Sequence, residues 1–269
     1  MRVFAIDWSG KLKGGEKNTW VAEVADGKLV RLDNGRTRQG VAQHLIDEAA
    51  RDRRMIVGLD FAFSLPVWFL EERGFTRAQK LWESCAGGTA EEWLSGCEPP
   101  FWGRPGKRRP VLESGCDHYR RTEREVWRET GFKPKSVFQI GGAGAVGTGS
   151  LRGMPVLHSL ETAGFSTWPF SEPWWPLIVE IYPRLLTGLV NKSNAAERAA
   201  YLSEHRDSIE GRLIEEAAGS EDAFDAAISA LVMWKNLSNL VALPSVEDWQ
   251  VVREGAIWHP DLVVSSAEF

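Results

Sequence analysis

Hydrophobic and polar positions along the first sixty residues predict strands on either side of a helix. RVFAID (2–7) is a short apolar run that ends in an acid, and NTWVAEVA (18–25) alternates before a DG turn and KLVRL (28–32). A DG pair between two such runs predicts a hairpin. Residues 37–54 then carry apolar side chains at helical spacing. MIVGLD (55–60) is almost continuously apolar, which is typical of a strand buried on both faces.

The remaining pattern extends this strand–helix–strand order into one domain. A helix between two apolar strands predicts a parallel pair joined by a right-handed crossover. From about residue 61 to 174 the periodicity loosens, with helical stretches at 66–73, 76–85, 89–95 and 117–130. It tightens again in an apolar strand at 176–183, three helical segments at 194–204, 207–218 and 221–234, and a short strand or loop at 255–260.

We therefore expect a single α/β domain over residues 1–269. Its sheet should be mixed and five-stranded, flanked by helices, with a long insertion at about 61–174 between strands 4 and 5. The glycine-rich stretch GGAGAVGTGS (141–150) spells GxGxxG. It lacks the firm helix and the distant acid of a dinucleotide fingerprint, so it predicts a flexible loop near the site.

Composition narrows the classes of function. No run approaches the roughly 20 apolar residues that span a bilayer, and the first ten residues do not resemble a signal peptide. Three cysteines cannot all pair within one chain, which fits a reducing compartment. We therefore expect a cytoplasmic protein without a membrane partner. No GxSxG motif accompanies the five histidines, so an acyl-transfer triad has little support.

Acidic residues close three of the apolar strand patterns. Asp7, Asp60 and Glu180 each stand in or at the end of such a run. Burying a charge there is costly unless something compensates for it. Ala5 and Gly58 lie two positions before the two aspartates and share their faces, which leaves room for a helix to pack closely.

The helix pattern at 221–234 is the candidate for that packing. Asp222 and Asp225 lie three residues apart and therefore share a face of this helix. Clustered carboxylates repel one another and hold protons unless a cation neutralises them. Oxygen ligands favour Mg²⁺ or Mn²⁺, and such ions can activate water and stabilise the leaving oxygen of a phosphodiester.

Four of these segments resemble a known family. IDWSG (6–10), VGLDFAFSLP (57–66), VEIYPRLL (179–186) and EDAFDAAISAL (221–231) are similar to the signatures of the family called domain of unknown function 429. That family is predicted to contain nucleases of ribonuclease H fold. The last segment also resembles the final helix of RuvC-type Holliday-junction resolvases, which carries two catalytic aspartates three residues apart.

The resemblance implies a ribonuclease-H-like fold and a catalytic set of acids. Carried over by motif, Asp7, Asp60 and Asp225 would be metal ligands, with Asp222 and Glu180 completing the catalytic group. This chain has Asp60 where the central strand of resolvases carries Glu, and its insertion is far longer. Resolvase activity itself therefore does not follow from the likeness.

Charge is distributed unevenly along the chain. The net charge is −5, yet residues 100–135 contain ten Lys and Arg against five Asp and Glu. With neighbouring Tyr119 and Trp127, this segment predicts a surface that holds phosphates by charge and unpaired bases by stacking. The predicted nucleic-acid contacts are Arg104, Lys107, Arg108, Arg109, Arg120 and Arg121.

The sequence thus predicts a nuclease that hydrolyses DNA or RNA through a carboxylate-bound Mg²⁺ or Mn²⁺ centre. Two alternatives stay open. One is an ATP-dependent phosphotransferase of actin-like architecture, with the glycine-rich stretch on the phosphates, although this normally needs a duplicated domain. The other is a non-catalytic nucleic-acid-binding module that keeps the fold.

Overall fold

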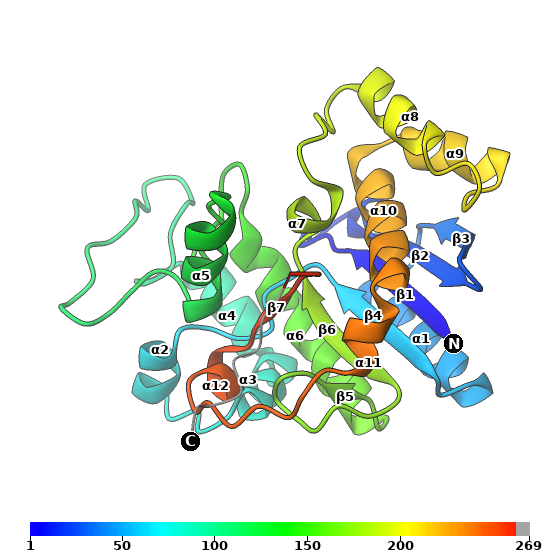
Figure 1. Ribbon diagram of the computed structural model, residues 1–269. Coiled ribbons are helices and arrows are strands. Elements are labelled where there is room, and N and C mark those ends of the chain that lie inside the picture. Colours follow the sequence, from blue (N-terminus) through cyan, green and yellow to red (C-terminus); the bar gives the residue numbers. More distant parts are fainter. Residues whose placement is uncertain (262–269) are drawn as a thin grey trace.

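A mixed seven-stranded sheet forms the centre of the molecule in the computed structural model, which describes residues 1–261 (Figure 1). Its strands are β1 (Arg2–Asp7), β2 (Trp20–Ala25), β3 (Lys28–Asp33), β4 (Met55–Leu59), β5 (Ser166–Thr167), β6 (Leu177–Ile181) and β7 (Ile257–Trp258). Their order is β3-β2-β1-β4-β6-β5, and β7 also pairs with β6. Only β2 runs against the direction of the others.

The predicted α/β class and mixed sheet are confirmed, whereas the predicted number of five strands is wrong. The two strands beyond this number, β5 and β7, contain two residues each; β5 is too short for a period of two to be visible in the sequence, whereas β7 lies in the stretch at 255–260 that was expected to be a short strand or loop. They follow each other along β6, since β5 pairs with its first half and β7 with its second half.

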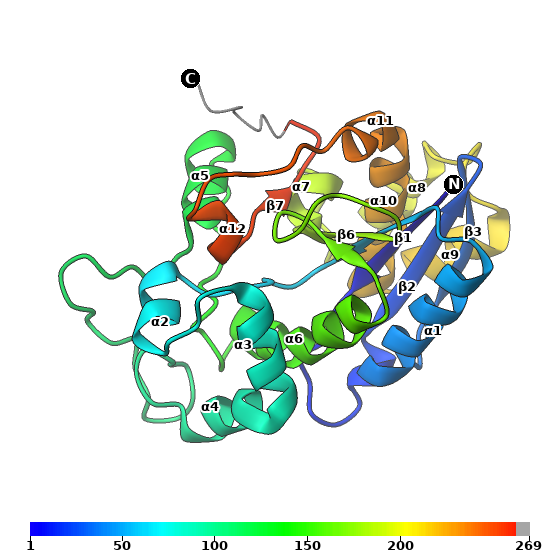
Figure 2. The ribbon, with the colours of Figure 1, turned by 90° about the horizontal axis from the view of Figure 1, so that it is seen from below.

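Helices cover both faces of the sheet. Helix α10 (Glu221–Lys235) crosses one face, and α1 (Arg38–Arg51) and α6 (Val146–Thr162) lie together on the other (Figure 2). The remaining α-helices are α2 (Val67–Glu72), α3 (Ala78–Ser84), α4 (Ala90–Gly96), α5 (Arg121–Thr130), α7 (Pro183–Thr187), α8 (Ala195–Ser203), α9 (Gly211–Ala218), α11 (Leu237–Val241) and α12 (Val251–Glu254). Short turns of other helical types occupy Gly15–Lys17 and Cys85–Thr89.

Alternation along the strands divides the buried hydrophobic side chains between these two faces. Phe4 and Ile6 of β1 join the cluster that contains α1 and α6, whereas Val3 and Ala5 join the cluster that contains α10. A Cβ atom on Gly58 would lie 2.6 Å from the sulfur of Met233 on α10. The predicted close packing of this helix over small strand residues is therefore confirmed.

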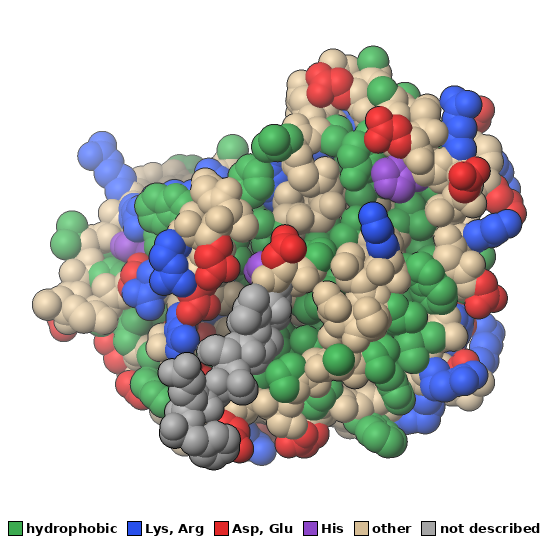
Figure 3. Space-filling model, viewed as in Figure 1, with side chains coloured by type: hydrophobic (Ala, Val, Ile, Leu, Met, Phe, Trp, Pro, Cys, Tyr) green, Lys and Arg blue, Asp and Glu red, His purple; other side chains and the backbone are tan. Residues whose placement is uncertain are grey.

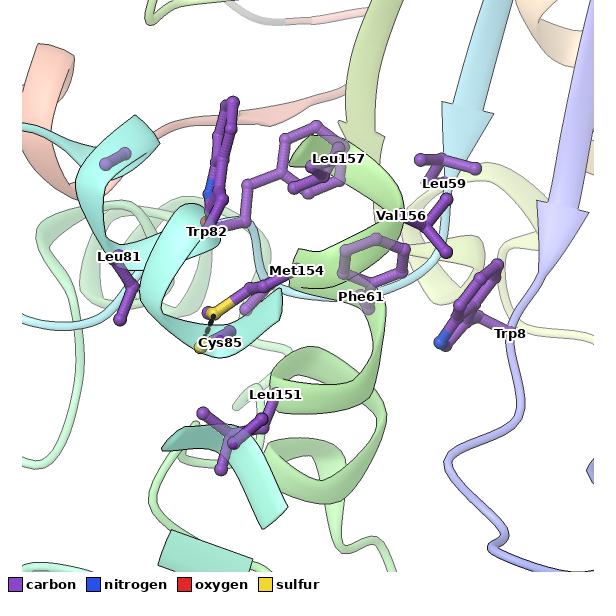
Figure 4. Packing of buried hydrophobic residues seen from close by; sticks show 14 of the residues in the cluster. Trp8, Leu59, Phe61, Leu81, Trp82, Cys85, Leu151, Met154, Val156 and Leu157 are labelled. Carbon is purple, nitrogen blue, oxygen red and sulfur yellow. Dashed lines mark hydrogen bonds between the residues drawn. The ribbon is translucent and has the colours of Figure 1, made fainter. Parts of the chain in front are cut away.

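The glycine-rich stretch differs from its prediction, because its second half belongs to α6. Close packing explains the glycines of this helix. A Cβ on Gly147 would lie 2.1 Å from the carbonyl oxygen of Val137, and one on Gly153 would lie 2.5 Å from the ring of Phe61. Figure 4 shows Phe61 between α6 and Trp8. Tertiary contacts therefore outweigh the low helix propensity of glycine here.

The segment between β4 and β6, where the insertion was expected at about 61–174, contains α2 to α6 and β5. The helix predicted at 117–130 begins only at Arg121. Among residues 1–261, no helix has the length and apolar character needed to cross a membrane.

Candidate metal centre and nucleic-acid interface

Three elements bring predicted acids to one edge of the sheet. Strands β1 and β4 are parallel with Ile6 opposite Leu59, and the backbone N–H of Asp60 donates to the carbonyl of Ile6 at 3.1 Å. Asp7 and Asp60 therefore lie side by side at the carboxyl ends of the two strands. Asp225 lies in the second turn of α10, which packs over the same face.

The carboxylates lie close enough to change one another's protonation. Burial raises the pKa of Asp7 well above its ordinary value, and the charges of Asp60, Asp225 and Asp222 raise it further. Burial, followed by the charge of Asp225, raises the pKa of Asp60 to about 8. Burial also raises the pKa of Asp225 to about 6. The structure thus brings together four of the five acids that the sequence singled out.

Lys192, which the sequence analysis missed, lies among these acids. Its ammonium group pairs with Asp225 and lowers the pKa of Asp7, Asp60 and Asp225. The buried guanidinium of Arg198 donates to the carbonyl of Lys192 and to that of Ala218, which fixes the loop. Lys192 lies between α7 and α8 in a loop without periodicity, so no sequence signal could have identified it.

Asn18 is a second polar residue that the sequence analysis missed. Its side-chain amide donates to Asp222 at 3.0 Å and accepts a hydrogen bond from Lys11 at 2.9 Å. The residue lies just before β2, whose first residue, Trp20, is opposite Asp7. The hairpin pattern could have indicated Asn18, because antiparallel pairing places the start of β2 beside the end of β1 and therefore beside Asp7.

Glu180 lies near Asp60, since its charge helps raise the pKa of Asp60 and both line the same hollow, but its side chain leaves the opposite face of the sheet. It alternates with Val179 along β6 and therefore points to the opposite face of the sheet. There its carboxylate accepts hydrogen bonds from the guanidinium of Arg120 and, at 2.9 Å, from the backbone N–H of Phe63. The other oxygen of Glu180 accepts from the same guanidinium, so both oxygens have hydrogen-bond partners.

The donor set of the four aspartates fits a divalent cation. Within residues 1–261, only Asp225 of the four forms an ion pair, and its Oδ1 atom is buried without a hydrogen-bond partner. Within the same residues, Lys192 is thus the cation that pairs directly with these acids, while Lys11 and Arg152 line the hollow beside Asp7 and Asp222. In the same described part of the chain, no three His, Cys, Asp or Glu side chains form a preformed ligand set. Asp7, Asp60 and Asp225 carry the oxygen ligands that Mg²⁺ and Mn²⁺ prefer.

Two hollows with common walls surround these acids. One of about 520 Å³ is lined by Asp7, Asp222 and the start of the glycine-rich stretch, and one of about 200 Å³ is lined by Asp60. Trp8 lines both hollows, and its indole N–H is buried without a partner among the described residues. The glycine-rich stretch therefore lies beside the acids, as expected.

The basic residues predicted to contact nucleic acid differ in exposure and in whether an acidic side chain already pairs with them. Arg104, Arg108 and Arg109 are exposed and form no ion pair within residues 1–261. Lys107 pairs with Glu98 at 2.7 Å, and Arg121 pairs with Glu125 and Asp248. Figure 3 shows Lys and Arg side chains gathered with acidic ones over α5.

Arg120 is a correction to the predicted interface, because it is fully buried. Its guanidinium donates to Glu180, to Glu123 at 2.8 Å, and to the carbonyl of Glu254 at 2.9 Å. An arginine with these three partners cannot reach a phosphate in solution. It instead fixes the start of α5 against β6 and α12.

Comparison with known proteins adds no relative. No protein-family model, no curated protein and no solved structure matches this chain.

Proposed function

We propose that this protein is a metal-dependent nuclease of ribonuclease-H-like fold that hydrolyses phosphodiester bonds of DNA or RNA. One observation carries the proposal: Asp7, Asp60 and Asp225 converge from three distant segments, while within residues 1–261 a direct ion pair is formed by Asp225 alone, with Lys192. A cluster of this kind destabilises a folded protein unless a ligand compensates for it, so it points to a functional site. The sheet, a hairpin extended by parallel strands, supports the fold assignment.

In the proposed nuclease each of these residues would have a distinct role. Asp7, Asp60 and Asp225 would hold Mg²⁺ or Mn²⁺, and Asp222, positioned by Asn18, would complete the ligand set. When bound, such a cation supplies water activation and charge neutralisation at the leaving oxygen. Lys192 limits the repulsion of the carboxylates before a cation arrives.

The described residues form one sheet, so the duplicated domain of an actin-like phosphotransferase is not found within residues 1–261. The remaining alternative, a binding module without chemistry, is distinguished from the nuclease by experiment.

The test is cleavage of labelled single-stranded and duplex DNA and RNA with Mg²⁺ or Mn²⁺. We expect the wild type to cleave at least one substrate, and Asp7→Asn or Asp60→Asn to slow cleavage by more than about a hundredfold. Losing even an outer-shell partner of a metal ligand costs about 10–100-fold. Asp47→Asn, an exposed aspartate on α1, is the matched control. Equal cleavage by Asp7→Asn, or nucleic-acid binding without any cleavage by the wild type, would refute the nuclease.

A further inference from the structure

Aromatic and cationic side chains alternate on the surface beside α5. The guanidinium carbon of Arg109 lies 5.5 Å from the ring centre of Trp102 and 5.7 Å from that of Tyr119. The ammonium nitrogen of Lys133 lies 5.6 Å from the ring centre of Tyr119 and 4.2 Å from that of Trp127. These five residues are called the ladder below.

Four ladder residues are at least partly accessible to solvent, whereas Trp102 is buried. Arg109 and Lys133 are exposed, and 46% of the surface of Trp127 is exposed. Neither cation forms an ion pair within residues 1–261. Figure 1 shows the chain between α4 and α5, which supplies Trp102, Arg109 and Tyr119, projecting beside α5.

Shared walls connect the ladder to the four aspartates. A hollow of about 310 Å³ is lined by four ladder residues and by Pro134 and Lys135. Pro134 and Lys135 also line the 200 Å³ hollow that contains Asp60, which in turn shares Trp8 with the hollow of Asp7. Lys135 lies over the glycine-rich stretch, since a Cβ on Gly144 would be 3.1 Å from its Cε atom.

The ladder is held in register with the acidic site. Tyr119 directly precedes Arg120, whose buried guanidinium binds Glu180 of β6. Glu180 in turn accepts from Phe63, three residues beyond Asp60. A short chain of buried hydrogen bonds thus connects the ladder with the segment that carries Asp60, so a ligand on one is positioned relative to the other.

We infer that the ladder binds the unpaired bases of a single-stranded nucleic acid and that Lys135 leads its backbone to the aspartates. This inference rests on the proposed nuclease for the identity of the site at the end of the path. An exposed cation–aromatic contact is weaker than a base stacked on an aromatic ring. A base can therefore displace Lys133 from Trp127 or Tyr119 and free its ammonium group for a phosphate. A duplex hides its base faces and gains only the charge contacts.

The test is fluorescence anisotropy of labelled oligonucleotides of about 20 nucleotides, enough to cover a typical single-strand site, in EDTA, so that no cleavage occurs. Single-stranded DNA, single-stranded RNA and a duplex of the same sequence form the three arms. We expect at least one single strand to bind about tenfold or more tightly than the duplex. Tyr119→Leu combined with Trp127→Leu should weaken that binding by about tenfold or more. Trp174→Leu, at an exposed tryptophan outside the ladder, should change it less than about twofold.

Charge is tested separately with Lys135→Gln against Lys28→Gln, an exposed lysine on β3. The first should reduce the slope of log affinity against log salt by about one, and the second should leave it unchanged. Equal binding of single strand and duplex, or wild-type affinity of the double ladder variant, would overturn the inference. If single strands bind and the ladder variants weaken that binding, but nothing is cleaved in Mn²⁺, the ladder inference holds and the nuclease is refuted. If only duplex is cleaved, the nuclease holds and the ladder inference is refuted.

Discussion

At the scale of single residues, Asp7, Asp60 and Asp225 make the stability of the folded state depend on pH. Burial and mutual repulsion raise the pKa of Asp60 to about 8 and that of Asp225 to about 6. The folded protein without metal therefore holds protons that the unfolded chain has already released. Its stability is fully present below the ordinary aspartate pKa and is lost as the pH rises through these raised values.

This linkage predicts how stability changes with pH in a chelator. Between pH 6.5 and 8.5 the free energy of unfolding should fall by about 2 kcal/mol from Asp60 alone, since one bound proton changes it by about 1.4 kcal/mol per pH unit. Burial lowers the pKa of His44, His118 and His259, so their opposite effect lies below this window. Urea unfolding at several pH values measures the change.

The matched variants for this measurement are Asp60→Asn and Asp207→Asn. The first removes the contribution of Asp60 and should make the profile less steep by that amount, whereas the second changes an exposed aspartate and should keep the slope. A wild-type profile that is flat or rises above pH 6.5 would contradict the proposed clustering.

At the scale of elements, α6 and α10 depend on close approaches that only glycine allows. Gly58 lets α10 settle on β4, and Gly153 lets α6 approach Phe61. Phe61 also contacts Trp8, with ring centres 4.9 Å apart, and Trp8 lines both hollows of the acidic site. The packing of α6 is therefore connected to the walls of the site.

We expect Gly153→Ala to destabilise the protein although alanine favours helix. Overpacking of this kind costs about 1–3 kcal/mol, which exceeds the gain of about 1 kcal/mol in helix propensity. Gly211→Ala in α9 is the control, because a Cβ there meets no atom within 4 Å, and its stability should stay equal or rise. Equal stability of Gly153→Ala and wild type in urea unfolding would show that Phe61 moves aside freely.

The same elements show what the sequence could predict. Strands β1, β4 and β6 and helix α10 were predicted because each has a strong apolar period, and parity placed Asp7 and Asp60 on one face. Helix α6 was missed because glycine usually disfavours helix, and its glycines are explained by close packing against residues distant in the chain. The burial of Arg120 and the ion pair of Lys192 depend on partners whose positions only the fold determines.

At the scale of the whole molecule, the two faces of the sheet place acidic residues in different surroundings near the same edge. The face under α10 carries Asp7 and Asp60 beside Asp225 of that helix, and within residues 1–261 Lys192 forms an ion pair with Asp225 alone of the three. The opposite face carries Glu180, whose charge Arg120 fully engages. The ladder lies in the segment between β4 and β6, and its hollow shares Pro134 and Lys135 with the hollow of Asp60, so the proposed ligand surface and the acids come from different parts of the chain.

Anomalous diffraction from crystals containing Mn²⁺ tests the central claim most directly, because it locates the cation without requiring the correct substrate. We predict an anomalous peak between Asp7, Asp60 and Asp225 that disappears in Asp7→Asn crystals. No peak at this position, or a peak that persists unchanged in Asp7→Asn, would contradict the metal centre and with it the proposed nuclease.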